Sequence, residues 1–206
     1  MLVVRYPLEQ IDFIPWAQST LSVERLEDLH LRADPLPFSN YVDRLKYCVE
    51  QMRVNFDVVL GSYVELIESV VAPLFGGVMH LQRPPSFRCH LAGAGTASAF
   101  HRDGDPKYGL RPGSINGWLP LTVANGNNSI YLETEQESKE FRSVSLVPGE
   151  LLIFDAFHLT HGSLRNDTQS SRVSFDFRFV PRCPRRAYEL GILLHEPVEQ
   201  PLDLSQ

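Results

Sequence analysis

The spacing of hydrophobic positions changes near residue 80 of the chain. Before that point apolar residues recur at helical spacing: Leu45, Val49, Met52, Phe56, Val59 and Tyr63. The stripe continues to Val71 and stops at Pro73, and Ser39 is expected to cap its first helix. Such a stripe is typical of helices that bury one face. We therefore expect residues 1–80 to be mainly helical and to support the rest of the chain.

After residue 80 the hydrophobic period changes to two. Short alternating or apolar runs are separated by Gly, Pro and Asn turns: FRCHLAG, SINGWLPLTV, NSIYLETE, RSVSLVPGELLIFD and SRVSFDFRFV. This spacing is typical of antiparallel strands in a sandwich, barrel or jelly roll. We predict one α+β domain with a β core over residues 81–182 and a C-terminal tail over 183–206. The helices are expected on the outer face of one sheet.

The composition narrows the class of protein. The chain has 206 residues, 43% of them hydrophobic and 21% charged, which is enough for one well-buried domain. No apolar run has membrane-helix length, and the N-terminus does not look like a cleavable signal. The cysteines, Cys48, Cys89 and Cys183, are far apart, which fits a reducing compartment. We expect a cytoplasmic protein, and the net charge of −6 disfavours a nucleic-acid partner.

The stretch AFHRDGDPKYG, residues 99–109, is the first candidate site. On a strand, residues i and i+2 share a face, so His101 and Asp103 would project together. They would supply two ligands of the 2-His-1-carboxylate triad that binds iron(II) and leaves other positions open. A polar hairpin tip explains the same residues, so the metal interpretation needs a third ligand from elsewhere.

Two histidines compete to be that third ligand. His158 and His161 are three residues apart and cannot face the same way on an extended strand. His158 lies between Phe157 and Leu159, as a packed residue would, whereas His161 is followed by Gly-Ser and a turn. We take His161 as the ligand. Metal binding by both histidines would favour a zinc or manganese site instead.

The run RVSFDFRF separates polar from aromatic residues. One face carries Arg172, Ser174, Asp176 and Arg178, and the other carries Val173 and three phenylalanines. The polar face could lie in water. Alternatively, the aromatic face packs under the helices and the polar face lines a barrel interior. In that case Arg172 and Ser174 suit a small carboxylate, because a guanidinium gives a bidentate, charge-assisted contact.

Taken in order, these residues resemble the iron(II)/2-oxoglutarate-dependent oxygenases. The pattern is His101-x-Asp103, then His161, then Arg172-x-Ser174 eleven residues later. PGELLIFDAFHLTHGSLRN is similar to the phytanoyl-CoA-hydroxylase-like branch. INGWLPLT followed by NNSIYLE resembles small bacterial members associated with aminoglycoside-type antibiotic biosynthesis. The resemblance covers residues 85–181 and implies a double-stranded β-helix, a cupin-type jelly roll.

The resemblance also implies a reaction. His101, Asp103 and His161 would hold Fe(II), while Arg172 with Ser174 would bind 2-oxoglutarate. With O2 as the other cosubstrate, a small polar metabolite would be oxidised with release of succinate and CO2. Halogenating relatives lack the carboxylate, so the presence of Asp103 favours hydroxylation, desaturation or oxidative cyclisation.

Further residues are candidates for the same pocket. Asn128 and Arg88 are proposed for the cosubstrate, and the following are proposed for the substrate: Trp118, Asn116, Arg178, His90 and Tyr108. Each also has an ordinary explanation, such as core filling, turn chemistry or surface placement.

Two other classes of function stay open from the sequence. A zinc- or manganese-dependent cupin isomerase or hydrolase would need no Arg172-x-Ser174 pair. A non-catalytic jelly roll that binds a ligand would keep the polar face without the reaction. A nucleic-acid demethylase uses the same triad, but the acidic charge counts against it. The sequence leaves the substrate and the oligomeric state open.

Overall fold

A computed structural model describes residues 1–32, 38, 40–108, 110 and 112–197 of the chain. Ser39 and the last nine residues of the predicted tail lie outside the described residues. The strands are β1 (Leu2–Arg5), β2 (Val78–Leu81), β3 (Ser86–His90), β4 (Ile115–Pro120), β5 (Tyr131–Glu133), β6 (Phe141–Ser143), β7 (Glu150–Phe154), β8 (His161–Gly162) and β9 (Arg172–Pro181).

The helical elements fall mostly in the first third of the chain. The α-helices are α1 (Ile14–Leu21), α2 (Tyr41–Val54), α3 (Leu60–Glu65), α4 (Ala72–Leu74) and α5 (Pro184–Glu189). Turns of 3-10 or π helix are η1 (Leu26–Leu31), η2 (Phe56–Val59), η3 (Leu66–Val71), η4 (Pro106–Tyr108) and η5 (Gly126–Asn128). Within the described part of the chain, no helix has the length and apolarity needed to cross a membrane.

The helix α2 begins at a side-chain cap. The side chain of Asn40 accepts a hydrogen bond from the backbone N–H of Asp43 at 3.1 Å, which satisfies one of the free donors of the first turn. The apolar stripe predicted from the sequence is buried at Met52, Phe56 and Tyr63. It runs through several short helical segments, because turns of 3-10 and π geometry interrupt the path between α2 and α4.

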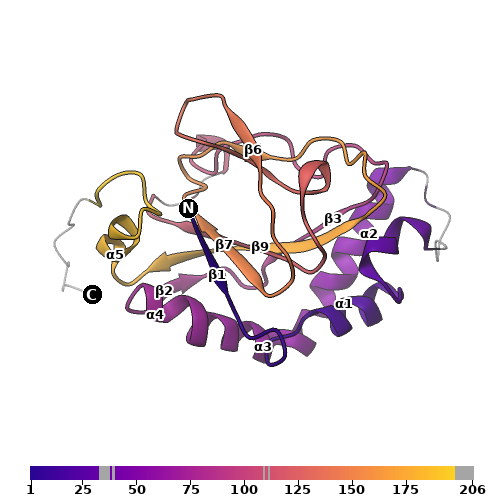
Figure 1. Cartoon of the computed structure of the whole chain (residues 1–206). Coiled ribbons are helices and arrows are strands. Elements are labelled where there is room, and N and C mark those ends of the chain that lie inside the picture. The colour runs from indigo at the N-terminus through magenta and orange to yellow at the C-terminus, as the bar shows by residue number, and fades with distance from the viewer. Residues whose placement is uncertain (33–37, 39, 109, 111, 198–206) are drawn as a thin grey trace.

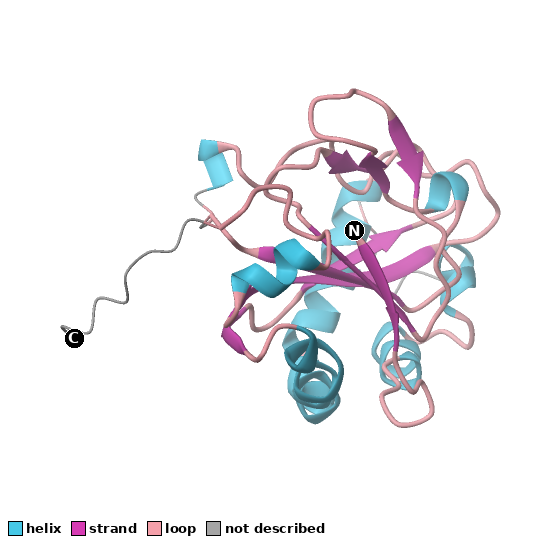
Figure 2. Ribbon diagram, turned by 60° about the vertical axis from the view of Figure 1, so that its left-hand side comes forward, coloured by secondary structure: helices cyan, strands magenta, loops and turns pink. Residues whose placement is uncertain are grey.

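Two antiparallel sheets form the rest of the fold. The larger sheet has six strands in the order β1-β7-β4-β9-β2, and β3 also pairs with β9. The smaller sheet has the order β6-β5-β8. Figures 1 and 2 show the larger sheet between the N-terminal helices and the smaller sheet. The predicted α+β arrangement of antiparallel sheets with N-terminal helices is confirmed, but β1, β2 and β8 were not predicted.

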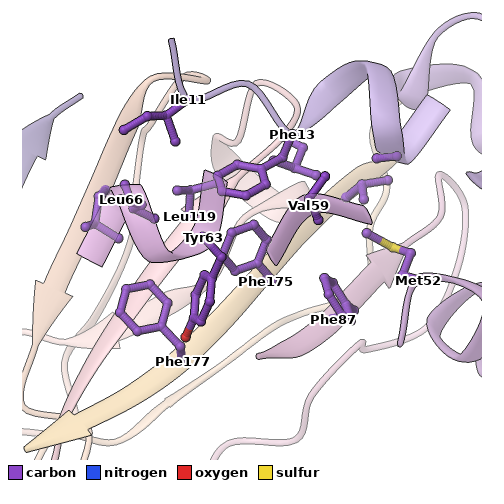
Figure 3. Close-up of a cluster of buried hydrophobic side chains, with 14 of the residues drawn as sticks. Ile11, Phe13, Met52, Val59, Tyr63, Leu66, Phe87, Leu119, Phe175 and Phe177 are labelled. Atoms are coloured by element: carbon purple, nitrogen blue, oxygen red, sulfur yellow. The ribbon is translucent and has the colours of Figure 1, made fainter. Parts of the chain in front are cut away.

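The two faces of β9 explain how the layers are assembled. Phe175 and Phe177 point into the helical layer, where the ring of Phe13 meets Phe175 edge-on at 5.1 Å and Tyr63 meets Phe177 at 5.6 Å (Figure 3). Burying one such ring stabilises the fold by about 1.5–3 kcal/mol, so this face is fixed inward. The opposite face, which carries Arg172, is buried as well. A strand with its polar face in water is therefore the wrong interpretation.

The close packing of β9 on β4 requires a glycine. A Cβ atom on Gly117 would lie 2.4 Å from Cζ of Phe177, closer than carbon atoms approach. The strand register places Gly117 directly opposite Phe177. The neighbours Asn116 and Trp118 therefore face the other side, the same side as the polar residues of β9.

Candidate metal centre

A short backbone bridge brings the two predicted histidine ligands together. The amide of His101 donates to the carbonyl of His161 at 2.9 Å, and the amide of His161 donates back at 2.9 Å. The imidazole centroids are 4.4 Å apart. Gly162 permits this approach, because a Cβ there would lie 2.8 Å from Cα of Phe100.

Asp103 reaches the same place from a turn, not from a strand. Its amide donates to the carbonyl of Ala156 at 2.8 Å, and the amide of Gly104 donates to the carbonyl of Phe157 at 3.1 Å. A Cβ on Gly104 would lie 2.4 Å from that Phe157 oxygen. The expected strand alternation is therefore wrong as the cause, although His101 and Asp103 do converge.

The donor atoms of His101, Asp103 and His161 lie within 4.8 Å of one another. Oδ1 of Asp103 is 3.4 Å from Nε2 of His101 and 3.9 Å from Nε2 of His161. Both Nδ1 atoms face backbone carbonyls, of Ala99 at 2.8 Å and Leu159 at 3.1 Å. A carbonyl accepts only, so each Nδ1 carries a proton. In the neutral ring, Nε2 then keeps its lone pair and points it inward. Two imidazole nitrogens and a carboxylate oxygen suit a divalent first-row metal.

The charges of the site favour the ligand forms of Asp103 and His161, whereas the hydrogen bond to Asp103 raises the pKa of His101 and favours its proton when no metal is bound. Burial alone would raise the pKa of Asp103, but hydrogen bonds from His101 and Arg178 outweigh it and hold the pKa well below its usual range. Burial lowers the pKa of His161, and the neighbouring His101 acts in the same direction. Asp103 is thus ionised and His161 neutral, as metal ligands must be.

Arg178 does not project freely into the pocket as a substrate anchor would. Its Nε donates to Oδ2 of Asp103 at 2.7 Å and its Nη2 donates to Oδ1 at 3.2 Å. The structure therefore gives Arg178 a partner that the sequence did not indicate. Arg178 also lines the pocket, so its contact with substrate stays a prediction beside this observed contact with a candidate ligand.

A pocket extends from the two histidines to Arg172. It is lined by Arg88, Ser98, His101, Asn116, Trp118, Ile130, Phe154, His161, Gly162, Arg172, Asp176 and Arg178. The side chain of Arg172 is buried, and its Nη1 donates to the carbonyl of Asn128 at 3.0 Å. Burial, followed by the charge of Arg88, lowers the pKa of Arg172 to about 10, so it remains a cation at neutral pH.

Buried polar atoms without a protein partner gather in this region. They are Oδ1 of Asn116, Nε1 of Trp118, Nε of Arg172 and Oγ of Ser174. Buried polar groups are nearly always hydrogen-bonded, so each such atom calls for an explanation. All of them belong to β4 or β9, which pair through Trp118 opposite Asp176 and Pro120 opposite Ser174. Donors and acceptors clustered on adjacent strands indicate a site for a polar ligand.

The other predicted residues lie at varying distances from the pocket. The side-chain oxygen of Asn128 accepts a hydrogen bond from the backbone N–H of Asn125 at 2.8 Å, within the same turn. Only the backbone carbonyl of Asn128 contacts Arg172. His90 is buried away from the pocket lining, with Nε2 at 3.0 Å from the carbonyl of Gly95. Turn chemistry and core packing therefore account for Asn128 and His90.

Arg88 and Tyr108 lie beside the metal cluster. Nε of Arg88 donates to Oδ1 of Asp176 at 3.1 Å, and both side chains line the pocket. The ring of Tyr108 lies 5.1 Å from that of His101, with 42% of the residue exposed. The sequence placed Asp176 on the polar face of its strand but gave it no role.

His158 lies outside the cluster. Its Nδ1 is 2.8 Å from Oδ2 of the buried Asp155, and its ring packs against His195 at 4.6 Å. Among the described residues the metal cluster contains His101, Asp103 and His161 and no further histidine. The three-histidine set of the zinc or manganese alternative is not assembled there.

A curated relative aligns along most of the chain. The chain is 31% identical over 179 residues to the streptomycin biosynthesis protein StrG of Streptomyces griseus, covering 87% of this chain and 84% of StrG. The chain belongs to the StrG family. No family model matches this StrG-family chain.

A solved structure shares the fold at low sequence identity. The apo form of ThoJ, a non-heme monooxygenase, has a TM-score of 0.50 and 13% identity, covering 87% of the StrG-family chain and 74% of ThoJ. AviO1 from Streptomyces viridochromogenes Tue57 has a TM-score of 0.49 and 15% identity, covering 87% and 90%. At this sequence identity the likeness to ThoJ supports the fold and not a function.

Proposed function

We propose that this StrG-family protein is an iron(II)- and 2-oxoglutarate-dependent oxygenase of a small polar metabolite. The observation that carries the proposal is one pocket with two complementary ends. At one end His101, Asp103 and His161 converge on a common point. At the other end a buried guanidinium, that of Arg172, keeps an unpaired donor.

In this proposal Fe(II) is held by Nε2 of His101, Nε2 of His161 and Oδ1 of Asp103. When bound, iron with 2-oxoglutarate and O2 supplies a two-electron oxidation of the substrate, with formation of succinate and CO2. A facial set of three protein ligands leaves room for a chelating cosubstrate and O2. The presence of Asp103 supports hydroxylation, desaturation or oxidative cyclisation over halogenation.

Arg172 and Ser174 are assigned to the far carboxylate of 2-oxoglutarate. An arginine with a free edge pairs with a carboxylate through two charge-assisted hydrogen bonds. The pocket walls Ile130 and Phe154 are buried and apolar, so they exclude water around this pair. Trp118 stands beside the guanidinium, whose central carbon is 5.7 Å from the ring centroid, and holds its plane in position.

The substrate class is inferred from the pocket and from the relative. Most of the side chains that line the pocket are polar or charged, among them Arg88, Asn116 and Asp176, which supports a hydroxylated or amine-bearing metabolite over an apolar one. StrG is by name a streptomycin biosynthesis protein. We therefore place this protein in aminoglycoside-type natural-product biosynthesis, with Asn116 and Tyr108 as the candidate substrate contacts.

The same proposal extends to the architecture. The two sheets are taken to close into a double-stranded β-helix, and the chain is taken to act as a single oxygenase domain. Cys48, Cys89 and Cys183 form no disulfide with one another, which supports action in the reducing cytoplasm.

The test needs no knowledge of the substrate. Fe(II) and then 2-oxoglutarate are added anaerobically to the apo-protein, and the weak visible charge-transfer band of the chelate is recorded. The band should appear with the wild type and vanish in Asp103→Ala. Metal binding without the band would instead support a zinc- or manganese-dependent cupin. Absence of metal binding would leave a ligand-binding protein without the reaction.

A further inference from the structure

We propose that Gln82 is a positioning residue for the Asp103 carboxylate and acts on it through Arg178. The inference rests on the proposed function, since it takes Asp103 as a metal ligand. Gln82 follows β2 directly and lies between β2 and β3, far from Asp103 in the sequence. The proposed function gives it no part.

The guanidinium of Arg178 is held on two sides. Its Nε and Nη2 donate to Asp103, and its Nη1 donates to Oε1 of Gln82 at 3.3 Å. The backbone amide of Arg178 donates to the same Oε1 at 3.2 Å. A guanidinium is planar and its N–H bonds point in fixed directions, so a third contact fixes the tilt of the whole plane. Gln82 therefore sets how Arg178 meets Asp103.

Gln82 is itself fixed by its neighbours. Its backbone amide donates to the carbonyl of Arg178 at 2.8 Å, and its carbonyl accepts from the hydroxyl of Tyr63 at 2.8 Å. Its Nε2 donates to Oγ of Ser86 at 2.9 Å. Arg178 offers only N–H donors to the side chain, so the amide oxygen must face it and the orientation is settled. Tyr63 comes from α3, which links the helical layer to the carboxylate.

This arrangement divides the two oxygens of Asp103. Oδ2 takes the short bond from Arg178 at 2.7 Å, whereas Oδ1 takes the longer one at 3.2 Å and also faces the Nε2 atoms of both histidines. One oxygen is thereby kept for a metal and the other is kept away from it. A carboxylate free to turn could bind with both oxygens. The second oxygen would then occupy a position that a chelating 2-oxo acid needs.

The consequence is a split between two binding measurements. Loss of the Gln82 contact should weaken chelation of 2-oxoglutarate more than it weakens metal binding. Partners of metal ligands change affinity or activity by about 10–100-fold when removed. Gln82 acts one residue further out, so we expect about a three- to tenfold rise in the 2-oxoglutarate needed for the chelate band. Metal affinity should stay within about threefold.

The experiment compares three variants of the full chain. Gln82→Leu removes the acceptor, Gln82→Glu keeps an acceptor oxygen at the same reach, and Ser86→Ala removes only the outer hydrogen bond. Mn(II) affinity is measured from the electron paramagnetic resonance signal of the free ion. The 2-oxoglutarate requirement is measured from the anaerobic Fe(II) chelate band. Gln82→Leu should show the split, while Gln82→Glu and Ser86→Ala should lie close to the wild type.

The role of Gln82 is overturned if folded Gln82→Leu needs no more 2-oxoglutarate than the wild type. It is also overturned if the 2-oxoglutarate requirement rises equally in Gln82→Leu and Gln82→Glu. If Gln82→Leu does not fold, Arg178→Lys replaces it, because lysine keeps the charge but cannot span both partners. An unchanged 2-oxoglutarate requirement in that variant also overturns the inference. Asp103→Ala separates failure of the proposed function from failure of this inference. If that variant still binds Mn(II), the assignment of Asp103 as a metal ligand is refuted, and the positioning role of Gln82 is refuted as well.

Discussion

Replacing Arg172 with leucine tests the cosubstrate end of the pocket. Leucine fills much of the buried space but cannot pair with a carboxylate. Among the described residues the hydrogen bond of Arg172 goes to Asn128, and none goes to the metal cluster. Removing the guanidinium should therefore leave metal binding unchanged and weaken only the binding of 2-oxoglutarate.

The size of the effect follows from burial. Arg172 is only 1% exposed, so water cannot replace the lost contact. Truncating a buried, hydrogen-bonded charge pair costs about 2–5 kcal/mol. That range corresponds to roughly thirtyfold to a few thousandfold in affinity. The Asn128 carbonyl also loses its donor, which costs about 1–3 kcal/mol of stability.

The assay is an anaerobic titration of the Fe(II) protein with 2-oxoglutarate, alongside Mn(II) binding and thermal unfolding. Arg172→Lys is the matched control, because lysine keeps the positive charge but cannot make the bidentate contact of a guanidinium. Its 2-oxoglutarate requirement should lie between those of the wild type and Arg172→Leu. A 2-oxoglutarate requirement unchanged in folded Arg172→Leu would refute the placement of the cosubstrate. Equal loss of Mn(II) binding would mean that Arg172 supports the metal centre instead.

Further predictions concern the ligands, the core and pH. His161→Ala should abolish metal binding, while His158→Ala should keep it, as Mn(II) titration will show; the reverse would move the ligand. Gly117→Ala should destabilise the fold by about 1–3 kcal/mol in thermal unfolding, because its Cβ would overlap Phe177. Gly61→Ala is its control: nothing lies within 4 Å of the added Cβ, and Gly61 is in helix α3, so this change should leave the stability unchanged or raise it slightly. Burial and the charge of Arg172 lower the pKa of His90 to about 4. In the unfolded chain His90 has its ordinary pKa of about 6.5, so it takes up a proton at a higher pH than in the folded chain. The free energy of unfolding should therefore fall between pH 6.5 and pH 4, by about 3 kcal/mol at pH 4. Chemical unfolding of His90→Gln should lack this contribution, and an equal slope would contradict it.

The alternation of β9 was readable from the sequence because period two is a direct property of a strand. Four polar and four apolar residues in RVSFDFRF fix two faces, and the helical stripe indicated which one is covered. The identity of His101, Asp103 and His161 as a cluster also followed from residue types and order. The reason for their convergence did not, since a turn held by Ala156 and Phe157 replaces the expected strand.

The partner of Arg178 could not be predicted. Asp103 lies 75 positions away, and an arginine on a pocket face has many possible partners until the tertiary structure is known. Gln82 carried no sequence signal either, because its role depends on a turn between two unpredicted pairings with β9. The strand β1 was missed because Leu2–Arg5 is short and its partner, β7 (Glu150–Phe154), lies far away in the sequence.

The double use of β9 limits how the chain can change its length. Inserting or deleting one residue in the strand would exchange its faces, placing Phe175 in the pocket and Ser174 in the core. Core and cosubstrate site would fail together, so this strand should not tolerate a single insertion or deletion.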